Sequence, residues 1–222
     1  MKTQNLIFAL LLGISAPNIA SAAAPHPDDA ARLNACITKT RTNATEAYED
    51  GLQWRLHGGG LLAEQCVALA QIEQGEYSEG AQRLLAIAQA SDGGPAAEKL
   101  GLLVKAANAF LLAEIPDEAK KALDLALAIE PNNSDALFDR ARASAMLSQW
   151  LEAEVDITNA MANKAPLPLA YRLRAETRLQ QGKYDLAEAD INEALRLEPN
   201  EADNYHVRGR VRIARRTGHA PE

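Results

Sequence analysis

The chain has 222 residues, with 23 Lys and Arg against 30 Asp and Glu, and a formal net charge of −7. About 47% of its residues are hydrophobic and 24% are charged, a balance typical of a globular protein. This acidic balance argues against a dedicated nucleic-acid binder, which needs a basic surface to neutralise phosphates. No apolar run reaches the roughly 18 to 20 residues that a membrane-spanning helix needs.

The first segment, residues 1–22, has the pattern of a secretory signal peptide. Lys2 supplies a positive start, the apolar run 6–14 follows, and small residues lead to Ala22. A charged start, a short apolar segment and an Ala-x-Ala site are typical of a signal that is cleaved on export. We therefore expect cleavage after Ala22 and a periplasmic or secreted protein, with a eukaryotic secretory lumen as the open alternative.

The rest of the chain repeats with a period of 34 residues, and Ala107, Ala141 and Ala175 form one of its alanine columns. The period predicts four hairpin units, at residues 61–94, 100–133, 134–167 and 168–201, with an insertion at 95–99. Residues 23–60 are expected to form a degenerate N-terminal hairpin, and residues 202–222 a capping helix and a basic tail.

Each unit predicts two antiparallel helices. In the last unit Tyr171, Ala175 and Leu179 recur at helical spacing, and Gly182 ends this first helix. Pro116 occupies the first turn of an earlier second helix, where its missing N–H costs nothing. One hairpin cannot bury its apolar face alone, so the units must stack. The sequence therefore predicts an all-α fold.

The period and the alanine columns resemble the tetratricopeptide repeat (TPR) family. The last unit carries the family's signature at Tyr171, Ala187, Ile191 and Pro199. It departs from the signature at Arg174-Ala175, where the family has Leu-Gly, and unit 134–167 has Ala165-Pro166 instead of a proline in register. The resemblance implies a TPR-type α-solenoid, a superhelical stack of antiparallel hairpins closed by a C-terminal capping helix.

The resemblance also implies a concave groove, lined by the first helix of each hairpin, that receives a peptide or a partner helix. Mapped onto this sequence, the groove comprises Asn108, Phe138, Asp139, Arg142, Leu169, Arg172, Glu176, His206 and Arg210, with Asp135, Leu173 and Asp203 on the same face. Apolar side chains beside arginines suit an amphipathic or extended segment. Some TPR domains grip a C-terminal carboxylate, but only Asn108 matches those columns. A solvated groove, or one filled by the chain's own tail, is the alternative.

Catalytic and metal-binding patterns are missing from the sequence. It has no nucleophile elbow, P-loop or dinucleotide-binding glycine pattern. Its four histidines stand too far apart in sequence to chelate zinc. We expect no enzymatic activity, no cofactor and no metal. The expected function is a scaffold or adaptor for a protein or peptide partner, and the alternative is a structural accessory subunit of a larger envelope assembly or secretion complex.

Two charge columns predict an ion pair inside each of two hairpins. Arg140 precedes Asp156 by sixteen residues, and Arg174 precedes Asp190 by the same interval. The preceding unit has alanine at both columns. Because a desolvated charge without its partner costs several kcal/mol, joint presence and joint absence favour pairing. Two independent surface charges are the alternative.

The two cysteines, Cys36 and Cys66, are expected to form a disulfide. An exported protein meets an oxidising compartment. The TPR resemblance places both residues on the first helices of neighbouring hairpins, where they approach one another across the groove. The bridge would stabilise the most degenerate unit by closing a loop of about 30 residues. Two buried thiols are the alternative.

The closing helix, expected over residues 202–217, is basic. Its arginines are Arg208, Arg210, Arg212, Arg215 and Arg216. A polar outer face that keeps the end of a repeat array soluble explains them without a partner. The alternative is a docking patch for an acidic partner or a peripheral contact with an anionic membrane surface.

Overall fold

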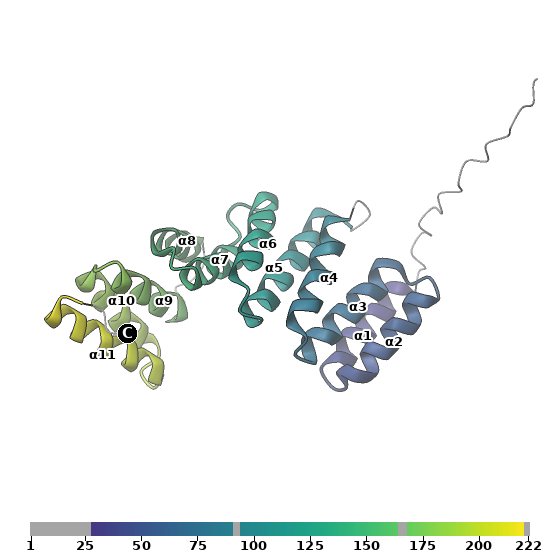
Figure 1. Ribbon diagram of the computed structural model, residues 1–222, viewed down its shortest axis with the longest axis horizontal. Coiled ribbons are helices and arrows are strands. Elements are labelled where there is room, and N and C mark those ends of the chain that lie inside the picture. The colour runs from purple at the N-terminus through teal and green to yellow at the C-terminus, as the bar shows by residue number, and fades with distance from the viewer. Residues whose placement is uncertain (1–27, 91–93, 164–167, 220–222) are drawn as a thin grey trace, which may run out of the picture.

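The computed structural model describes residues 28–90, 94–163 and 168–219. Within these ranges the chain forms eleven α-helices. They stack in chain order into an elongated, curved array with α1 and α11 near its two ends (Figure 1). The predicted all-α stack of helical hairpins is confirmed. The predicted signal segment 1–22 and the Ala165-Pro166 departure lie outside the described residues.

The helices alternate between first and second members of hairpins. The first helices are α1 (Asp29–Thr40), α3 (Gly60–Glu73), α5 (Ala96–Leu112), α7 (Ser134–Met146) and α9 (Pro168–Gln180). The second helices are α2 (Ala44–Leu56), α4 (Tyr77–Gln89), α6 (Pro116–Ile129), α8 (Trp150–Asn163) and α10 (Tyr184–Leu197). Helix α11 (Ala202–Thr217) occupies the place of a further first helix.

The insertion at residues 95–99 lengthens a helix. Helix α5 begins at Ala96, four residues before the expected unit boundary at Leu100, and reaches 17 residues. Pro95 precedes it with extended backbone (φ −66°, ψ 161°). Proline is well placed just before a helix, and the Ala-Ala-Glu sequence that follows consists of strong helix formers. The inserted residues therefore add a turn to α5.

A left-handed turn recurs at one repeat column, between the first and second helix of a hairpin. Gly75 and Gly182 adopt φ of 88° and 73° there. Glu114 and Ser148 stand in the same column and adopt φ of 57° and 58°. This conformation is unfavourable for residues that carry a Cβ. The geometry of the hairpin therefore overrides the local preference of the sequence at two of the four turns.

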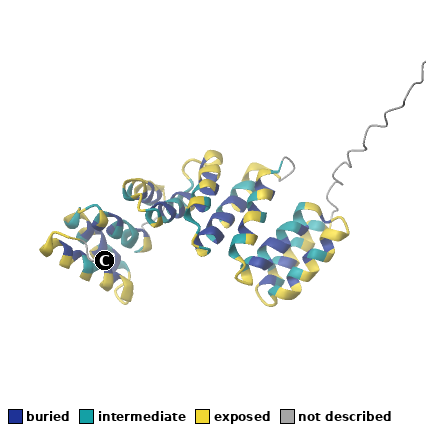
Figure 2. Ribbon diagram, in the orientation of Figure 1, coloured by how far each residue is buried: buried dark blue, intermediate teal, exposed yellow. Residues whose placement is uncertain are grey.

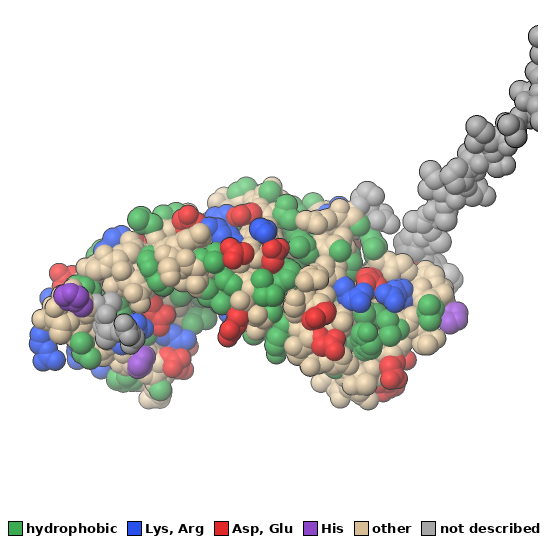
Figure 3. Space-filling model, in the orientation of Figure 1, with side chains coloured by type: hydrophobic (Ala, Val, Ile, Leu, Met, Phe, Trp, Pro, Cys, Tyr) green, Lys and Arg blue, Asp and Glu red, His purple; other side chains and the backbone are tan. Residues whose placement is uncertain are grey.

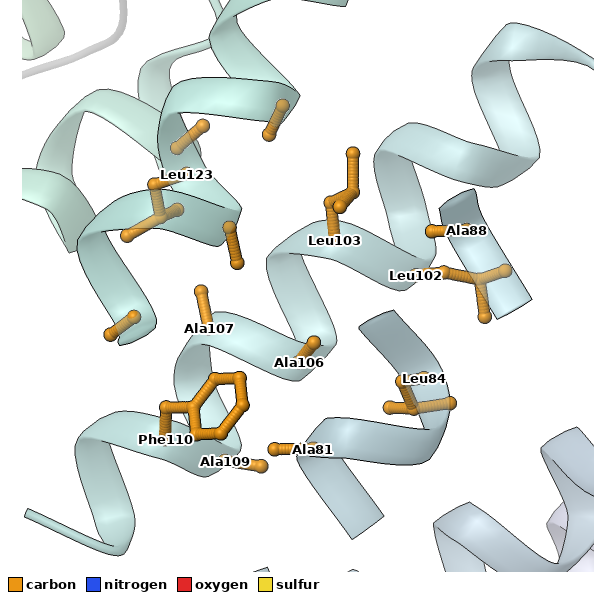
Figure 4. Close-up of a cluster of buried hydrophobic side chains, with 14 of the residues drawn as sticks. Ala81, Leu84, Ala88, Leu102, Leu103, Ala106, Ala107, Ala109, Phe110 and Leu123 are labelled. Carbon is orange, nitrogen blue, oxygen red and sulfur yellow. The ribbon is translucent and has the colours of Figure 1, made fainter. Parts of the chain in front are cut away.

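The core lies along the seams between neighbouring helices, where buried residues line the facing surfaces (Figure 2). Figure 4 shows its centre, where Leu84 of α4, Phe110 of α5 and Leu123 of α6 converge with alanines between them. The column alanines Ala107 and Ala141 are fully buried. Small side chains at these columns let helices approach closely, and large ones fill the remaining space.

The first helix is attached by a covalent bridge. A disulfide joins Cys36 of α1 to Cys66 of α3, with 5.9 Å between their Cα atoms. Cys36 and Thr40 are the residues that α1 buries. Because α1 contributes so little to the core, the bridge is a principal link between this helix and the stack.

Candidate functional site

Three first helices, α7, α9 and α11, together form a pocket of about 400 Å³. We call it the groove pocket; its lining residues are Phe138, Arg142, Leu169, Arg172, Leu173, Glu176, Asp203, His206, Val207 and Arg210. Seven of the nine residues in the predicted groove set belong to it, and Asn108 and Asp139 do not. Val207 also lines the pocket and was not predicted, although it stands 34 residues after Leu173 and so shares its repeat column.

One side of the groove pocket is apolar. Phe138, Leu169 and Leu173 contribute its hydrophobic surface. Leu169 remains 47% exposed. An apolar side chain left open to water beside two others gains free energy when a ligand covers it. This part of the pocket is therefore suited to an apolar anchor from a partner.

Arg172, on the cationic side of the pocket, already contacts two carboxylates of the same chain. Arg172 lies with its Nη1 3.1 Å from Oδ2 of Asp203 and 3.7 Å from Oε1 of Glu201. These contacts tie α9 to the start of α11 and hold the guanidinium in a fixed position. Because the Asp203 side chain is 71% exposed, a partner carboxylate can compete with it for Arg172.

Glu176 carries an acidic group into the same pocket. Its pKa is raised, chiefly because burial penalises the charged form. The nearby positive charges of Arg172 and Arg210 oppose this shift. The pocket thus places an acidic group and two arginines next to its apolar side.

Asn108 and Asp139 form a partly buried hydrogen-bond network beside the pocket. Nδ2 of Asn108 donates to Oδ2 of Asp139 (2.8 Å), and Nη1 of Arg142 donates to Oδ1 of Asp139 (3.0 Å). Burial raises the pKa of Asp139, and these two hydrogen bonds oppose the shift. Asn108 and Asp139 therefore lie outside the groove pocket and hold Arg142 through hydrogen bonds, and their contact with a partner stays a prediction.

The structure brings together both pairs of charges that the repeat columns indicated. Nε and Nη2 of Arg140 donate to the two carboxylate oxygens of Asp156 at 2.7 and 2.8 Å. Arg174 makes the same two-pronged contact with Asp190 at 2.9 and 2.7 Å. Each pair links the first and second helix of one hairpin, and both aspartates are buried.

A second group of ion pairs connects neighbouring hairpins and was not predicted. Glu154 of α8 accepts hydrogen bonds from Arg178, Gln181 and Lys183 at 2.6 to 2.9 Å. Burial alone would raise the pKa of Glu154, but these donors together lower it to about 2. Nη1 of Arg178 also donates to Asp190 (2.6 Å), so the two groups of contacts are joined.

The arginines of the basic helix α11 lie in different surroundings. Arg212 and Arg215 turn back to Glu188 of α10, and Arg215 also lies 2.9 Å from Asp185. Arg208 instead stacks on the ring of Tyr205, 5.0 Å from its centroid. Lys and Arg side chains gather at this end of the molecule in the view of Figure 3. Two arginines of the alternative docking patch therefore already contact carboxylates of α10.

Metal clusters and membrane-spanning helices are both missing from the described residues. Residues 28–90, 94–163 and 168–219 contain no group of three or more His, Cys, Asp or Glu side chains placed to hold a metal ion. In the same ranges no helix is both long enough and apolar enough to cross a membrane.

Comparison with known proteins supports the repeat architecture. No protein-family model matches the chain, and no curated protein matches it. Among solved structures it is similar to a tetratricopeptide repeat protein from Parabacteroides merdae ATCC 43184, with a TM-score of 0.68, 16% identity, and coverage of 82% of this chain and 72% of that one. It is also similar to the Arabidopsis OM64 TPR domain, with a TM-score of 0.52, 26% identity, and coverage of 54% and 98%.

A third similar structure contains a bound peptide. It is the first TPR of Spaghetti (RPAP3) bound to the HSP90 peptide SRMEEVD, with a TM-score of 0.51, 24% identity, and coverage of 53% of this chain and 94% of that one. Together these likenesses identify the chain as a repeat protein with the tetratricopeptide fold.

Proposed function

We propose that the chain is an exported, non-catalytic TPR scaffold that binds a protein or peptide segment in the groove pocket. The observation that carries this proposal is the pocket itself. Three successive first helices place an open apolar surface next to arginines whose positions are fixed by neighbouring carboxylates. A helical repeat surface of this kind recognises a segment by apolar anchoring and charge-assisted hydrogen bonds.

The chemistry of the pocket narrows the kind of segment. An apolar side chain would cover Leu169 and contact Phe138, while a carboxylate would compete with Asp203 for Arg172. A grip on a C-terminal carboxylate through Asn108 is not part of the proposal, because the Asn108 amide already bonds to Asp139. The Spaghetti structure supports a peptide ligand, since a domain of this fold was solved there with a peptide bound.

Export is part of the proposal and rests on the sequence pattern of residues 1–22. The disulfide between Cys36 and Cys66 supports it, because such bonds persist in oxidising compartments. The mass of the protein recovered from the envelope fraction tests it directly. We expect a mature chain that begins at residue 23, and an intact N-terminus in the cytoplasmic fraction would contradict export.

The groove is tested by recovering partners from the envelope fraction with purified protein as bait. The variant Phe138→Ala/Arg172→Ala removes an apolar and a cationic contact, and we expect it to lose the partner while keeping its helicity. The matched control is Leu151→Ala/Arg196→Ala, which likewise removes one large apolar residue and one arginine, from exposed positions on α8 and α10. Equal recovery of the partner by the groove variant and by the control would contradict the proposed site.

A further inference from the structure

The outer face of α11 repeats the face by which α9 holds its hairpin partner. In α9 that face contains Tyr171, Ala175 and Leu179, and it shares a buried cluster with Ala187, Ile191 and Ala194 of α10. One repeat later, 34 residues on, the same columns of α11 hold Tyr205, Gly209 and Ile213. An aromatic, a small and a branched apolar residue therefore recur in the same order.

These equivalent faces differ sharply in exposure. Ala175 and Leu179 are fully buried, whereas Tyr205 is 48% and Ile213 is 45% exposed. A Cβ built on Gly209 would meet nothing within 4 Å. Among the residues that the structure describes, no helix follows α11 to cover this face. Helix α11 thus presents, uncovered, the surface that α9 buries against a second helix.

The arginine that secures the second helix is repeated as well. Arg174 stacks on Tyr171, 5.6 Å from its ring centroid, and grips Asp190 of α10 with two hydrogen bonds. Arg208 stacks on Tyr205 in the same way, at 5.0 Å. Within the described part of the chain Arg208 makes no ion pair. Its guanidinium is therefore held in place while its carboxylate-binding edge is unused.

We propose that the outer face of α11, formed by Tyr205, Arg208, Gly209 and Ile213, docks an acidic amphipathic helix of another protein. The docked helix takes the position that α10 takes on α9, with a small residue over Gly209 and a carboxylate on Arg208. Small residues at the crossing point allow the two backbones to approach, and the two-pronged Arg contact fixes the register.

Charge complementarity decides between an acidic partner and a second copy of this chain. Helix α10, which α9 holds, carries four acidic residues, Asp185, Glu188, Asp190 and Glu193, against one arginine, Arg196. Helix α11 has the opposite balance, so an acidic helix complements it. Two α11 helices packed face to face would bring Arg208 and Arg216 of both copies together, and such like-charge contacts are unfavourable.

This site is separate from the groove pocket and does not rest on the proposed function. The pocket uses His206 and Arg210 of α11, whereas Tyr205, Gly209 and Ile213 do not line it. Variants of one surface therefore leave the other intact.

A peptide with the sequence of residues 183–198 is the probe, because α10 is the helix that the equivalent face holds. Short helices are marginal in water, so a staple joins positions 192 and 196, both exposed in α10. Fluorescence anisotropy of the labelled peptide, titrated with the purified protein, should show saturable binding. Arg208→Glu and Gly209→Leu should each weaken it by about tenfold or more, the first by charge reversal and the second by blocking the close approach.

Charge exchange provides the sharpest control. A peptide with Asp190→Lys should bind the wild-type protein poorly and regain affinity for the Arg208→Glu variant. Arg41→Glu, an equal charge change on an exposed residue at the far end of the stack, should leave binding unchanged. The groove variant Phe138→Ala/Arg172→Ala should also bind the peptide normally.

Four outcomes would overturn the inference. The peptide fails to bind, or it binds but is insensitive to both α11 substitutions. Sedimentation shows a dimer that Arg208→Glu dissociates, which would assign the face to a second copy. Anionic vesicles, but not the peptide, bind in an Arg208-dependent way, which would assign it to a membrane surface.

Discussion

Arg140 and Asp156 differ in how many partners each would keep if the other were removed. Asp156 is buried, and its two hydrogen bonds of 2.7 and 2.8 Å both come from Arg140. Arg140 is more exposed and also donates to Asp124 at 2.8 Å. The free-energy cost of breaking this pair should therefore depend on which partner is lost.

We expect Arg140→Ala to lower the free energy of unfolding by about 3 kcal/mol, because it leaves a buried carboxylate uncompensated. Asp156→Ala should cost only about 1 to 2 kcal/mol, because Arg140 keeps Asp124. The double variant should resemble Asp156→Ala, since alanines fill both columns in the preceding hairpin. Denaturant unfolding measures all three.

Arg174→Ala is the matched control for this asymmetry. Asp190 keeps the hydrogen bond from Arg178 (2.6 Å) when Arg174 is removed. Removing Arg174 should therefore lower the free energy of unfolding by less than removing Arg140 does. Equal costs for Arg140→Ala, Asp156→Ala and Arg174→Ala would show that these charges behave as independent surface groups.

Glu154 makes stability depend on pH in a defined window. Its pKa in the folded protein is about 2, against an ordinary value of 4.5. The folded state therefore stabilises the ionised carboxylate of Glu154 more than the unfolded state does. The resulting stabilisation is complete above pH 4.5 and is lost as the pH falls towards 2.

We expect wild-type protein to lose about 2 to 3 kcal/mol more unfolding free energy across this window than the Glu154→Gln variant does. Asp139 and Glu176 have raised pKa values, so their protonation at low pH acts in the opposite direction. Because both variants retain them, the difference between the two pH profiles isolates Glu154. Parallel profiles would contradict this role.

At the scale of the element, α1 depends on the disulfide more than on packing. It buries Cys36 and Thr40, and its other contact residues are only partly covered. A crosslink spanning 30 residues restricts the unfolded chain and so stabilises the folded one. The bridge thereby compensates for a helix with a small apolar face.

We expect Cys36→Ala/Cys66→Ala to destabilise the attachment of α1 by about 2 to 4 kcal/mol. Amide hydrogen exchange should accelerate across Asp29–Thr40 and stay unchanged in α9, α10 and α11. Reduced wild-type protein keeps the sulfur atoms and serves as the control, because it separates the crosslink from lost packing. Unchanged protection of α1 in both samples would show that packing alone holds it.

The sequence predicted the ion pairs within a repeat but not those between repeats. The pair Arg174–Asp190 could be predicted because the same interval recurs in two units, and the alanine columns mark the helix contacts in the same way. Arg178 and Glu154 belong to different hairpins, and their contact depends on the rotation between units, which column alignment does not define. The same reason explains why the hydrogen bond between Asn108 and Asp139, which also joins two hairpins, was not predicted.

At the scale of the whole molecule, the core is divided along the stack. One cluster of buried side chains centres on α4, α5 and α6 and includes Leu123. Another joins α9, α10 and α11 and includes Ile191. In a stack where each hairpin contacts mainly its neighbours, stability is a sum of local and nearest-neighbour contributions. A destabilising substitution in one cluster should therefore lower the stability of the helices around it more than that of the distant helices.

We expect Ile191→Ala to remove about 3 kcal/mol of local stability, because Ile191 is fully buried and its truncation leaves a cavity. Amide hydrogen exchange should accelerate across Pro168–Thr217 and remain slow in α4, α5 and α6. Leu123→Ala, an equally buried residue of the other cluster, should give the reverse pattern. If both variants accelerate exchange equally along the whole stack, the array unfolds as one cooperative unit, and the groove pocket and the outer face of α11 would then share their stability with α1.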